Sequence, residues 1–218
     1  MTTVAIISQK GGAGKTTLAL HLAAAAVDDG RVALIVDTDP QATASQWAGW
    51  RKDEPPEVID SPPPRLAAKV EQAQAQGAEF IVIDTPPHAD SAARAAVEAA
   101  DLVLIPCRPS AFDLSAIQTT SKLVQLLRKP AFVVFTAGPP NAPRVYQEAG
   151  ELVESFGTPP CPFQMSDRAA FRHASAEGRT AMELEPDGKA ADEVRQLYKW
   201  TCRQVDVLAK YQDGKAAA

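Results

Sequence analysis

The segment Lys10-Gly-Gly-Ala-Gly-Lys-Thr-Thr17 constrains this chain more than any other, because it stands between an apolar run and a helical pattern. The run Val4–Ile7 predicts a buried strand, and the apolar residues that recur from Leu18 predict a helix. Glycines let a backbone approach a ligand closely and turn its N–H groups inward, and the following helix adds the positive end of its dipole. The segment therefore predicts a phosphate-binding loop.

Each residue of this loop has an expected part in binding a nucleotide. The binding residues are Lys10, Gly11, Gly12, Ala13, Gly14, Lys15, Thr16 and Thr17. Lys15 is expected to reach the β and γ phosphates, and Thr16 to place its hydroxyl on Mg²⁺. The loop departs from the general pattern G-x-x-x-x-G-K-[ST] and carries an additional lysine, Lys10. A turn that binds nothing is disfavoured, because strand, loop and helix occur in the order that a phosphate loop requires.

Apolar runs alternate with helical patterns along the rest of the chain. The later predicted strands are 31–36, 80–83, 102–106 and 131–135. This alternation predicts βαβ units, and therefore a P-loop α/β fold with a mainly parallel, twisted sheet and helices on both faces. The prolines at 53–56 and again at 61–64 indicate surface loop. We expect a single domain over 1–218, with a C-terminal helix at about 190–211 packed on it and a disordered tail at 212–218.

The composition disfavours several other classes of protein. No uninterrupted apolar run approaches the roughly 20 residues that span a bilayer, and the N-terminus enters the first strand without a secretory leader. We therefore expect a cytoplasmic protein. Cys107, Cys161 and Cys202 form no C-x-x-C pair, which argues against disulfides and against zinc or iron–sulfur sites. The net charge of −5 argues against a positive coat for nucleic acid but allows a local basic face.

Acidic residues follow the second and third predicted strands. Asp37 and Asp39 come after the second strand, and Asp84 ends the third. Ligands of open α/β sheets bind at the carboxyl ends of the strands, where the glycine loop also lies. A carboxylate there can hold Mg²⁺ through a coordinated water, so we expect a metal site at Thr16, Asp37 and Asp84. The alternative for any one aspartate is a helix cap or a turn.

The loop with its additional lysine resembles the deviant Walker A loop of the ParA/MinD class of P-loop ATPases. Val36-Asp-Thr-Asp-Pro-Gln41 is similar to the Walker A′ motif of that family, and Ile83-Asp-Thr-Pro-Pro87 to its Walker B and switch II. Further similarity at Ile105–Asp113 and Asp167–Gly178 extends the resemblance from about residue 3 to about residue 180. The chain looks most like the short ParA-type partition and positioning ATPases, which lack an N-terminal helix-turn-helix.

The resemblance implies an ATPase that uses Mg²⁺ and is slow without a partner. Asp39 would position the attacking water, Asp37 would support the metal region, and Lys10 would cross to the nucleotide of a second subunit. Lys10, Lys15 and Asp39 are therefore the expected catalytic residues. Two ATP molecules would be sandwiched in a homodimer. For adenine, the resemblance directs attention to the loops 136–143 and 162–166.

The expected dimer would bind DNA nonspecifically and associate with the nucleoid while it holds ATP. A cargo-bound partner of the ParB or adaptor type would then stimulate hydrolysis, which would segregate plasmid or chromosome DNA or position a protein cluster. A basic stripe for DNA is expected at Arg195, Lys199 and Arg203, four residues apart on the last predicted helix. Arg168 and Arg172 are expected to extend it. A solvated helix face is an equally good explanation of such a stripe.

Two other functions remain open at this point. A MinD-like spatial regulator needs a C-terminal amphipathic helix with bulky apolar residues, which Tyr211–Ala218 does not offer, so no membrane partner is expected. A metabolic P-loop ligase needs a small-molecule pocket that the sequence does not exclude. A reductase of the nitrogenase iron-protein type would need cluster cysteines, and the three present follow no such pattern.

Overall fold

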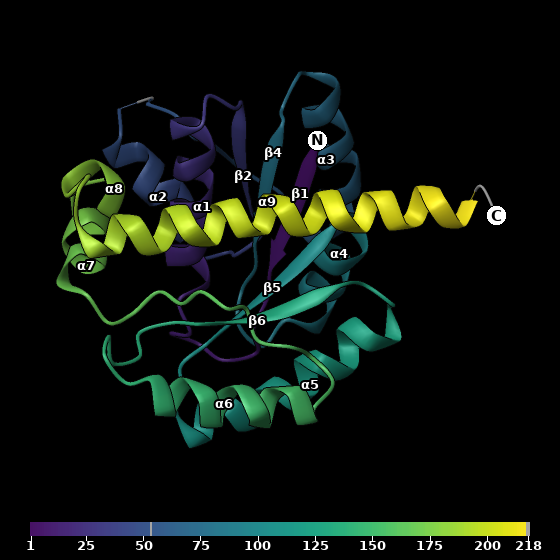
Figure 1. Ribbon diagram of the computed structural model, residues 1–218. Coiled ribbons are helices and arrows are strands. Elements are labelled where there is room, and N and C mark those ends of the chain that lie inside the picture. Colours follow the sequence, from purple (N-terminus) through teal and green to yellow (C-terminus); the bar gives the residue numbers. More distant parts are fainter. Residues whose placement is uncertain (53, 217–218) are drawn as a thin grey trace.

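The computed structural model describes residues 1–52 and 54–216, and it places six parallel strands in one sheet. The strands are β1 (Thr2–Ile6), β2 (Ala33–Asp37), β3 (Glu57–Asp60), β4 (Phe80–Asp84), β5 (Leu102–Cys107) and β6 (Ala131–Phe135). They lie in the order β3-β2-β4-β1-β5-β6 (Figure 1). The predicted α/β fold with a parallel sheet is confirmed.

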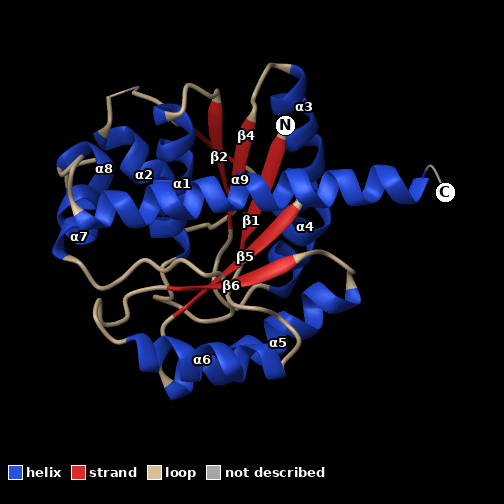
Figure 2. Cartoon of the chain, viewed as in Figure 1, coloured by secondary structure: helices blue, strands red, loops and turns tan. Residues whose placement is uncertain are grey.

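Helices cover both faces of this sheet (Figure 2). One face carries α1 (Lys15–Asp28), α2 (Thr43–Trp50), α7 (Ala169–Ala176), α8 (Ala181–Leu184) and α9 (Lys189–Ala216). The other carries α3 (Leu66–Ala75), α4 (Asp90–Ala99), α5 (Ala111–Leu126) and α6 (Pro143–Ser155), and a 3-10 turn, Pro63–Arg65, precedes α3. Successive strand residues point to opposite faces. Val4 and Ile6 therefore enter one apolar core, whereas Ala5 and Ile7 enter the other.

Proline-rich segments lie next to both edge strands of the sheet. Beside β6, the backbone N–H of Val133 donates to the Pro159 carbonyl (2.9 Å), and that of Met165 donates to the Phe135 carbonyl (2.9 Å). At the other edge, β3 is a short strand with exposed Glu57 and Asp60 at its ends. The sequence predicts surface loop at 53–56 and at 61–64 and predicts no strand between them, so β3 was missed. Prolines flank this strand on both sides and charged residues stand at its ends, so its sequence lacks the apolar pattern that predicts a strand.

The last helix is longer than predicted. It begins at Lys189 and continues to Ala216, so the expected tail at 212–218 is helical to that point, and residues 217–218 lie outside the described part. Its first half packs on α1 and α8 through Val194, Leu197 and Tyr198. Its C-terminal end projects past the rest of the molecule (Figure 1). None of the described helices is long and apolar enough to cross a membrane.

Candidate functional site

The glycine loop lies at the carboxyl end of β1, in the centre of the sheet, as the sequence predicts. Gly12 and Gly14 have φ angles of 72° and 90°, a conformation that strains any residue with a side chain. Gly14 directly precedes α1 and its carbonyl accepts the N–H of Leu18 (2.9 Å). The Thr136 hydroxyl donates to the Ala13 carbonyl (2.7 Å), which ties the loop to the end of β6. The loop is therefore held in place from two sides.

Lys15 turns back over this loop. Its ammonium donates to the Lys10 carbonyl (3.2 Å), and only 7% of the residue is exposed. Burial lowers the pKa of Lys15, while the carboxylates of Asp84 and Asp39 act in the opposite direction. The structure thus places the predicted phosphate-binding lysine and two predicted acidic residues within one electrostatic site.

Asp84 is the most unusual group of this site. It is 1% exposed, and neither carboxyl oxygen has a hydrogen-bond partner in the described part of the chain. The pKa of Asp84 is raised to about 7, mainly by burial and also by the nearby charges of Asp37 and Asp39, while the neighbouring Thr16 hydroxyl and the Lys15 ammonium act in the opposite direction. Buried polar atoms nearly always have a hydrogen-bond partner, so a buried carboxylate without one indicates a catalytic role or a bound ion. Hard oxygen donors of this kind suit Mg²⁺.

Asp37 caps α2 as well as lying near Asp84. One of its oxygens accepts the N–H groups of Ala44 (3.0 Å) and Ser45 (3.3 Å), and the other accepts that of Asp39 (3.0 Å). Burial raises the pKa of Asp37, and these N–H groups lower it. The capping alternative considered for these aspartates therefore applies to Asp37, in addition to its place at the site.

The described residues include no cluster of three or more His, Cys, Asp or Glu side chains that could hold a metal ion. Asp84 and Thr16 fit a Mg²⁺ ion that takes its remaining ligands from nucleotide phosphates and water, which is the usual arrangement for this metal. When bound, the ion would neutralise phosphate charge. A metal cage made by protein ligands alone does not fit these residues.

Lys10 lies at the outer side of the loop. Its ammonium is 3.8 Å from a carboxylate oxygen of Asp113, whose side chain is 13% exposed. Asp113 belongs to the first turn of α5, where the Ser110 hydroxyl accepts its backbone N–H (3.4 Å). In this state Lys10 is held within its own chain.

A pocket of about 550 Å³ adjoins the loop. Its lining includes Gly12, Gly14 and Thr17 at the loop and the apolar side chains of Met165 and Phe171. The two loops proposed for adenine both contribute, through Thr136 and Ala137 and through Met165 and Ser166. The pocket has the size of a small-molecule site, and its lining combines apolar side chains with polar and charged ones.

Two arginines that the sequence suggested for DNA, Arg168 and Arg172, line this pocket. Arg168 binds Glu193 with two nitrogens (3.0 and 2.7 Å), and Arg172 pairs with Asp167. Their positive charge is therefore largely matched by carboxylates. The sequence could not show this, because Arg168 and Glu193 lie on different elements.

The stripe on α9 is also less uniform than its spacing suggests. Arg195 donates to the Pro186 carbonyl (2.7 Å) and lies near Asp28 (4.0 Å) and Asp192 (3.8 Å). Lys199 and Arg203 are exposed, and their side chains have no ion pair within residues 1–52 and 54–211. These two residues are the part of the stripe that presents free positive charge.

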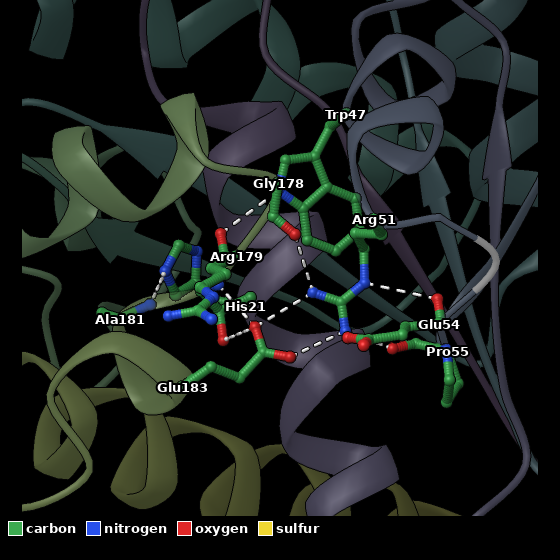
Figure 3. Close-up of polar contacts among 10 residues, drawn as sticks. His21, Trp47, Arg51, Glu54, Pro55, Gly178, Arg179, Ala181 and Glu183 are labelled. Carbon is green, nitrogen blue, oxygen red and sulfur yellow. Dashed lines mark hydrogen bonds and ion pairs between the residues drawn. The ribbon is translucent and has the colours of Figure 1, made fainter.

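A buried arginine that the sequence analysis missed joins α2 to the segment between α7 and α8 (Figure 3). The Arg51 guanidinium binds both oxygens of Glu183 (2.7 and 3.0 Å), donates to the Gly178 carbonyl (3.0 Å) and stacks 4.5 Å from the Trp47 ring. The Trp47 indole N–H donates to the Arg179 carbonyl (3.2 Å). The helix that follows Asp37 and Asp39 is thereby fixed to the wall of the pocket.

His21 links the same segment to the phosphate-loop helix (Figure 3). Its Nδ1 donates to the Thr17 carbonyl (2.7 Å), and its Nε2 accepts the N–H of Ala181 (3.0 Å), so the ring is neutral with its proton on Nδ1. The ring is fully buried, with Phe171 at 5.0 Å, and burial lowers the pKa of His21 to about 4.

Comparison with known proteins places this geometry in a family. Residues 4–181 match the CobQ/CobB/MinD/ParA nucleotide binding domain. The chain is 32% identical over 209 residues to maintenance of carboxysome distribution protein A of Halothiobacillus neapolitanus, which covers 89% of this chain and 94% of that protein. It is 28% identical over 166 residues to chromosome partitioning protein ParA of Myxococcus xanthus, which covers 58% of this chain and 59% of that one.

Two solved structures share the fold. Apo McdA of Cyanothece has a TM-score of 0.75 at 19% identity and covers 93% of this chain and 99% of its own. The cell division ATPase MinD of Pyrococcus furiosus has a TM-score of 0.75 at 20% identity and covers 94% of this chain and 99% of its own. At these identities the likeness concerns the architecture.

Proposed function

The chain belongs to the CobQ/CobB/MinD/ParA nucleotide-binding family, and we propose that it is an ATPase that positions a cellular cargo. The observation that carries this proposal is the meeting of buried Lys15 with unpaired, buried Asp84 beside a pocket of about 550 Å³. A phosphoryl-transfer site needs fixed positive charge and a metal-holding carboxylate at one place, and this place provides both.

We assign the site residues the roles that the motifs and the family resemblance imply. Lys15 would move from the Lys10 carbonyl to the β and γ phosphates, Thr16 and Asp84 would hold Mg²⁺, and Asp39 would orient the attacking water. Asp37 supports the metal region through its fixed carboxylate. The adenine would lie against the apolar side chains of Phe171 and Met165, which line the pocket.

We further propose that ATP joins two copies of the chain, with Lys10 crossing to the nucleotide of the second copy. Lys10 is suited to this because it lies at the outer side of the loop and is held by one partly exposed ion pair with Asp113. Such pairs contribute roughly 0–1 kcal/mol, so exchanging Asp113 for a phosphate costs little.

The proposed cargo is a protein body, with DNA as the surface on which the ATP-bound dimer is held. Two relatives that match 89% and 93% of this chain are named for carboxysome distribution, whereas the chromosome-partitioning relative matches 58%. A partner protein on the cargo would stimulate hydrolysis and release the dimer. Segregation of a chromosome or plasmid is the alternative cargo assignment.

The experiment measures nucleotide binding and assembly in the same samples. The parent should bind ATP with Mg²⁺ and become dimeric by light scattering, and Lys15→Ala should bind ATP at least tenfold more weakly, since a charge-assisted contact is removed. DNA should raise turnover only together with the cargo-bound partner. A parent that stays monomeric in saturating ATP would refute the dimer. A Lys15→Ala variant that binds ATP like the parent would refute the site.

A further inference from the structure

The segment that follows β5 runs beside the phosphate loop. β5 pairs with β1 in parallel register, with Leu104 opposite Ile6, so the chain after β5 continues past the end of β1 at the same edge of the sheet as the glycine loop. Arg108 is the first residue after this strand, and it is exposed. Its Nη2 atom lies 3.7 Å from the point that a Cβ on Gly12 would occupy. The guanidinium therefore lies over the backbone of the phosphate loop.

The backbone on both sides of Arg108 is fixed. The Cys107 carbonyl accepts the N–H of Thr136 (2.9 Å), and Thr136 also binds the phosphate loop. Pro109 packs so closely on Gly138 that a Cβ there would lie 2.6 Å from the proline ring. Ser110 then caps α5. Arg108 thus extends from a rigid base, which reduces the entropy lost when its side chain binds a ligand.

Arg108 differs from the other arginines of the pocket in its charge balance. Arg168 and Arg172 also line the pocket, and each is paired with a carboxylate. The side chain of Arg108 has no hydrogen bond or ion pair anywhere in residues 1–52 and 54–211. The carboxylate nearest in sequence, Asp113, faces Lys10. The pocket therefore keeps one unmatched guanidinium, at its phosphate-loop end.

We propose that Arg108 is a nucleotide-binding residue, whose guanidinium contacts the phosphates of the nucleotide held by the same chain. This inference rests on the proposed function. A guanidinium presents two parallel N–H donors that match phosphate oxygens, and it keeps its charge at all ordinary pH values. Its place over Gly12, in the glycine loop, directs it to the phosphates that such a loop binds.

The test measures the affinity of the monomer for ADP, because ADP binding does not need a second copy. Arg108→Ala should raise the Kd for ADP by about tenfold or more, as expected for loss of a charge-assisted contact. Arg108→Lys should lose less, because it keeps a charge without the planar fork. The matched control is Arg144→Ala, whose side chain is 90% exposed on α6 and pairs with Glu148 outside the pocket, and it should bind ADP like the parent.

GDP identifies which part of the nucleotide is contacted. A phosphate contact predicts that Arg108→Ala loses the same factor for ADP and for GDP, whereas a loss confined to ADP would place the arginine at the base and overturn the proposal. An Arg108→Ala variant that binds ADP within twofold of the parent would also overturn it, and so would a variant that keeps ADP affinity but loses ATP-driven dimerisation. If Lys15→Ala is weakened and Arg108→Ala is not, this inference fails and the proposed function stands.

Discussion

The buried histidine on the phosphate-loop helix makes stability depend on pH with a defined sign. His21 is neutral in the folded protein, because its Nε2 must accept the N–H of Ala181 while its Nδ1 donates to Thr17. Protonation would remove the acceptor and bury a charge. The folded pKa of about 4 lies below the ordinary value of 6.5, so the unfolded chain takes up the proton first. The stability that His21 contributes is complete above pH 6.5 and is lost as pH falls toward 4.

The folded and ordinary pKa values of His21 determine how much the free energy of unfolding changes with pH. Between pH 7.5 and pH 5, the difference in proton binding should lower the free energy of unfolding by about 2 kcal/mol. Asp84 acts with the opposite sign, because its folded pKa of about 7 lies above the ordinary carboxyl value of 3.8. Its contribution is complete below pH 3.8 and is lost as pH rises through 7. The parent alone would therefore show only the sum of the two effects.

A comparison between two proteins isolates the histidine. Urea unfolding of the nucleotide-free parent and of His21→Gln should be measured at pH 7.5 and at pH 5. Glutamine can accept the Ala181 N–H but does not titrate, and Asp84 is common to both proteins, so its effect cancels. The stability advantage of the parent should shrink by about 2 kcal/mol at the lower pH. An advantage that is equal at the two pH values would refute this account of His21.

Three further predictions concern other parts of the molecule. Arg51→Met should lower the free energy of unfolding by about 2 kcal/mol, since it leaves half-buried Glu183 without its positively charged partner while the Thr180 N–H and hydroxyl still donate to it, and Glu183→Gln in the same chain should recover part of the loss in urea unfolding. Asp39→Ala should still bind ATP but hydrolyse it slowly, so light scattering should find dimers that persist; a variant that stays monomeric in saturating ATP would contradict this. Replacing Lys199 and Arg203 with alanine should reduce the slope of log DNA affinity against log salt by about two per chain while dimerisation persists, and an unchanged slope would exclude α9 as the DNA surface.

The sequence predicts five of the six strands and misses the short edge strand β3. β1, β2, β4, β5 and β6 are apolar runs buried by helices on both faces, so periodicity alone identifies them. β3 has four residues with exposed, charged ends, and it is a strand because it pairs with β2 from Leu34 to Asp37. That pairing depends on tertiary contact, which a local pattern does not contain.

The candidate site likewise contains residues that the sequence predicts and contacts that it does not. Lys15 and Asp84 belong to motifs at the ends of strands, and their convergence follows from parallel topology. The ion pair of Arg51 with Glu183 joins residues 132 positions apart, and no spacing rule predicts it. The glycine at position 178 is the local sequence feature that relates to this contact. In the structure, its φ of +68° and its close approach to Trp50 leave no room for a side chain.

The two proline-rich margins of the sheet restrict how this protein can associate. An open strand edge invites further strands, because its N–H and C=O groups lie unpaired. Along β6 those groups are occupied by the segment around Pro159, Cys161 and Met165, and two prolines of that segment, Pro159 and Pro160, have no N–H to offer outward. At the opposite margin, the short strand β3 has one carboxylate at each end, and these carboxylates would repel those of a second copy of the strand. Copies of this chain that meet are thus directed to associate through side-chain surfaces and are kept from joining strand to strand into a continuous sheet.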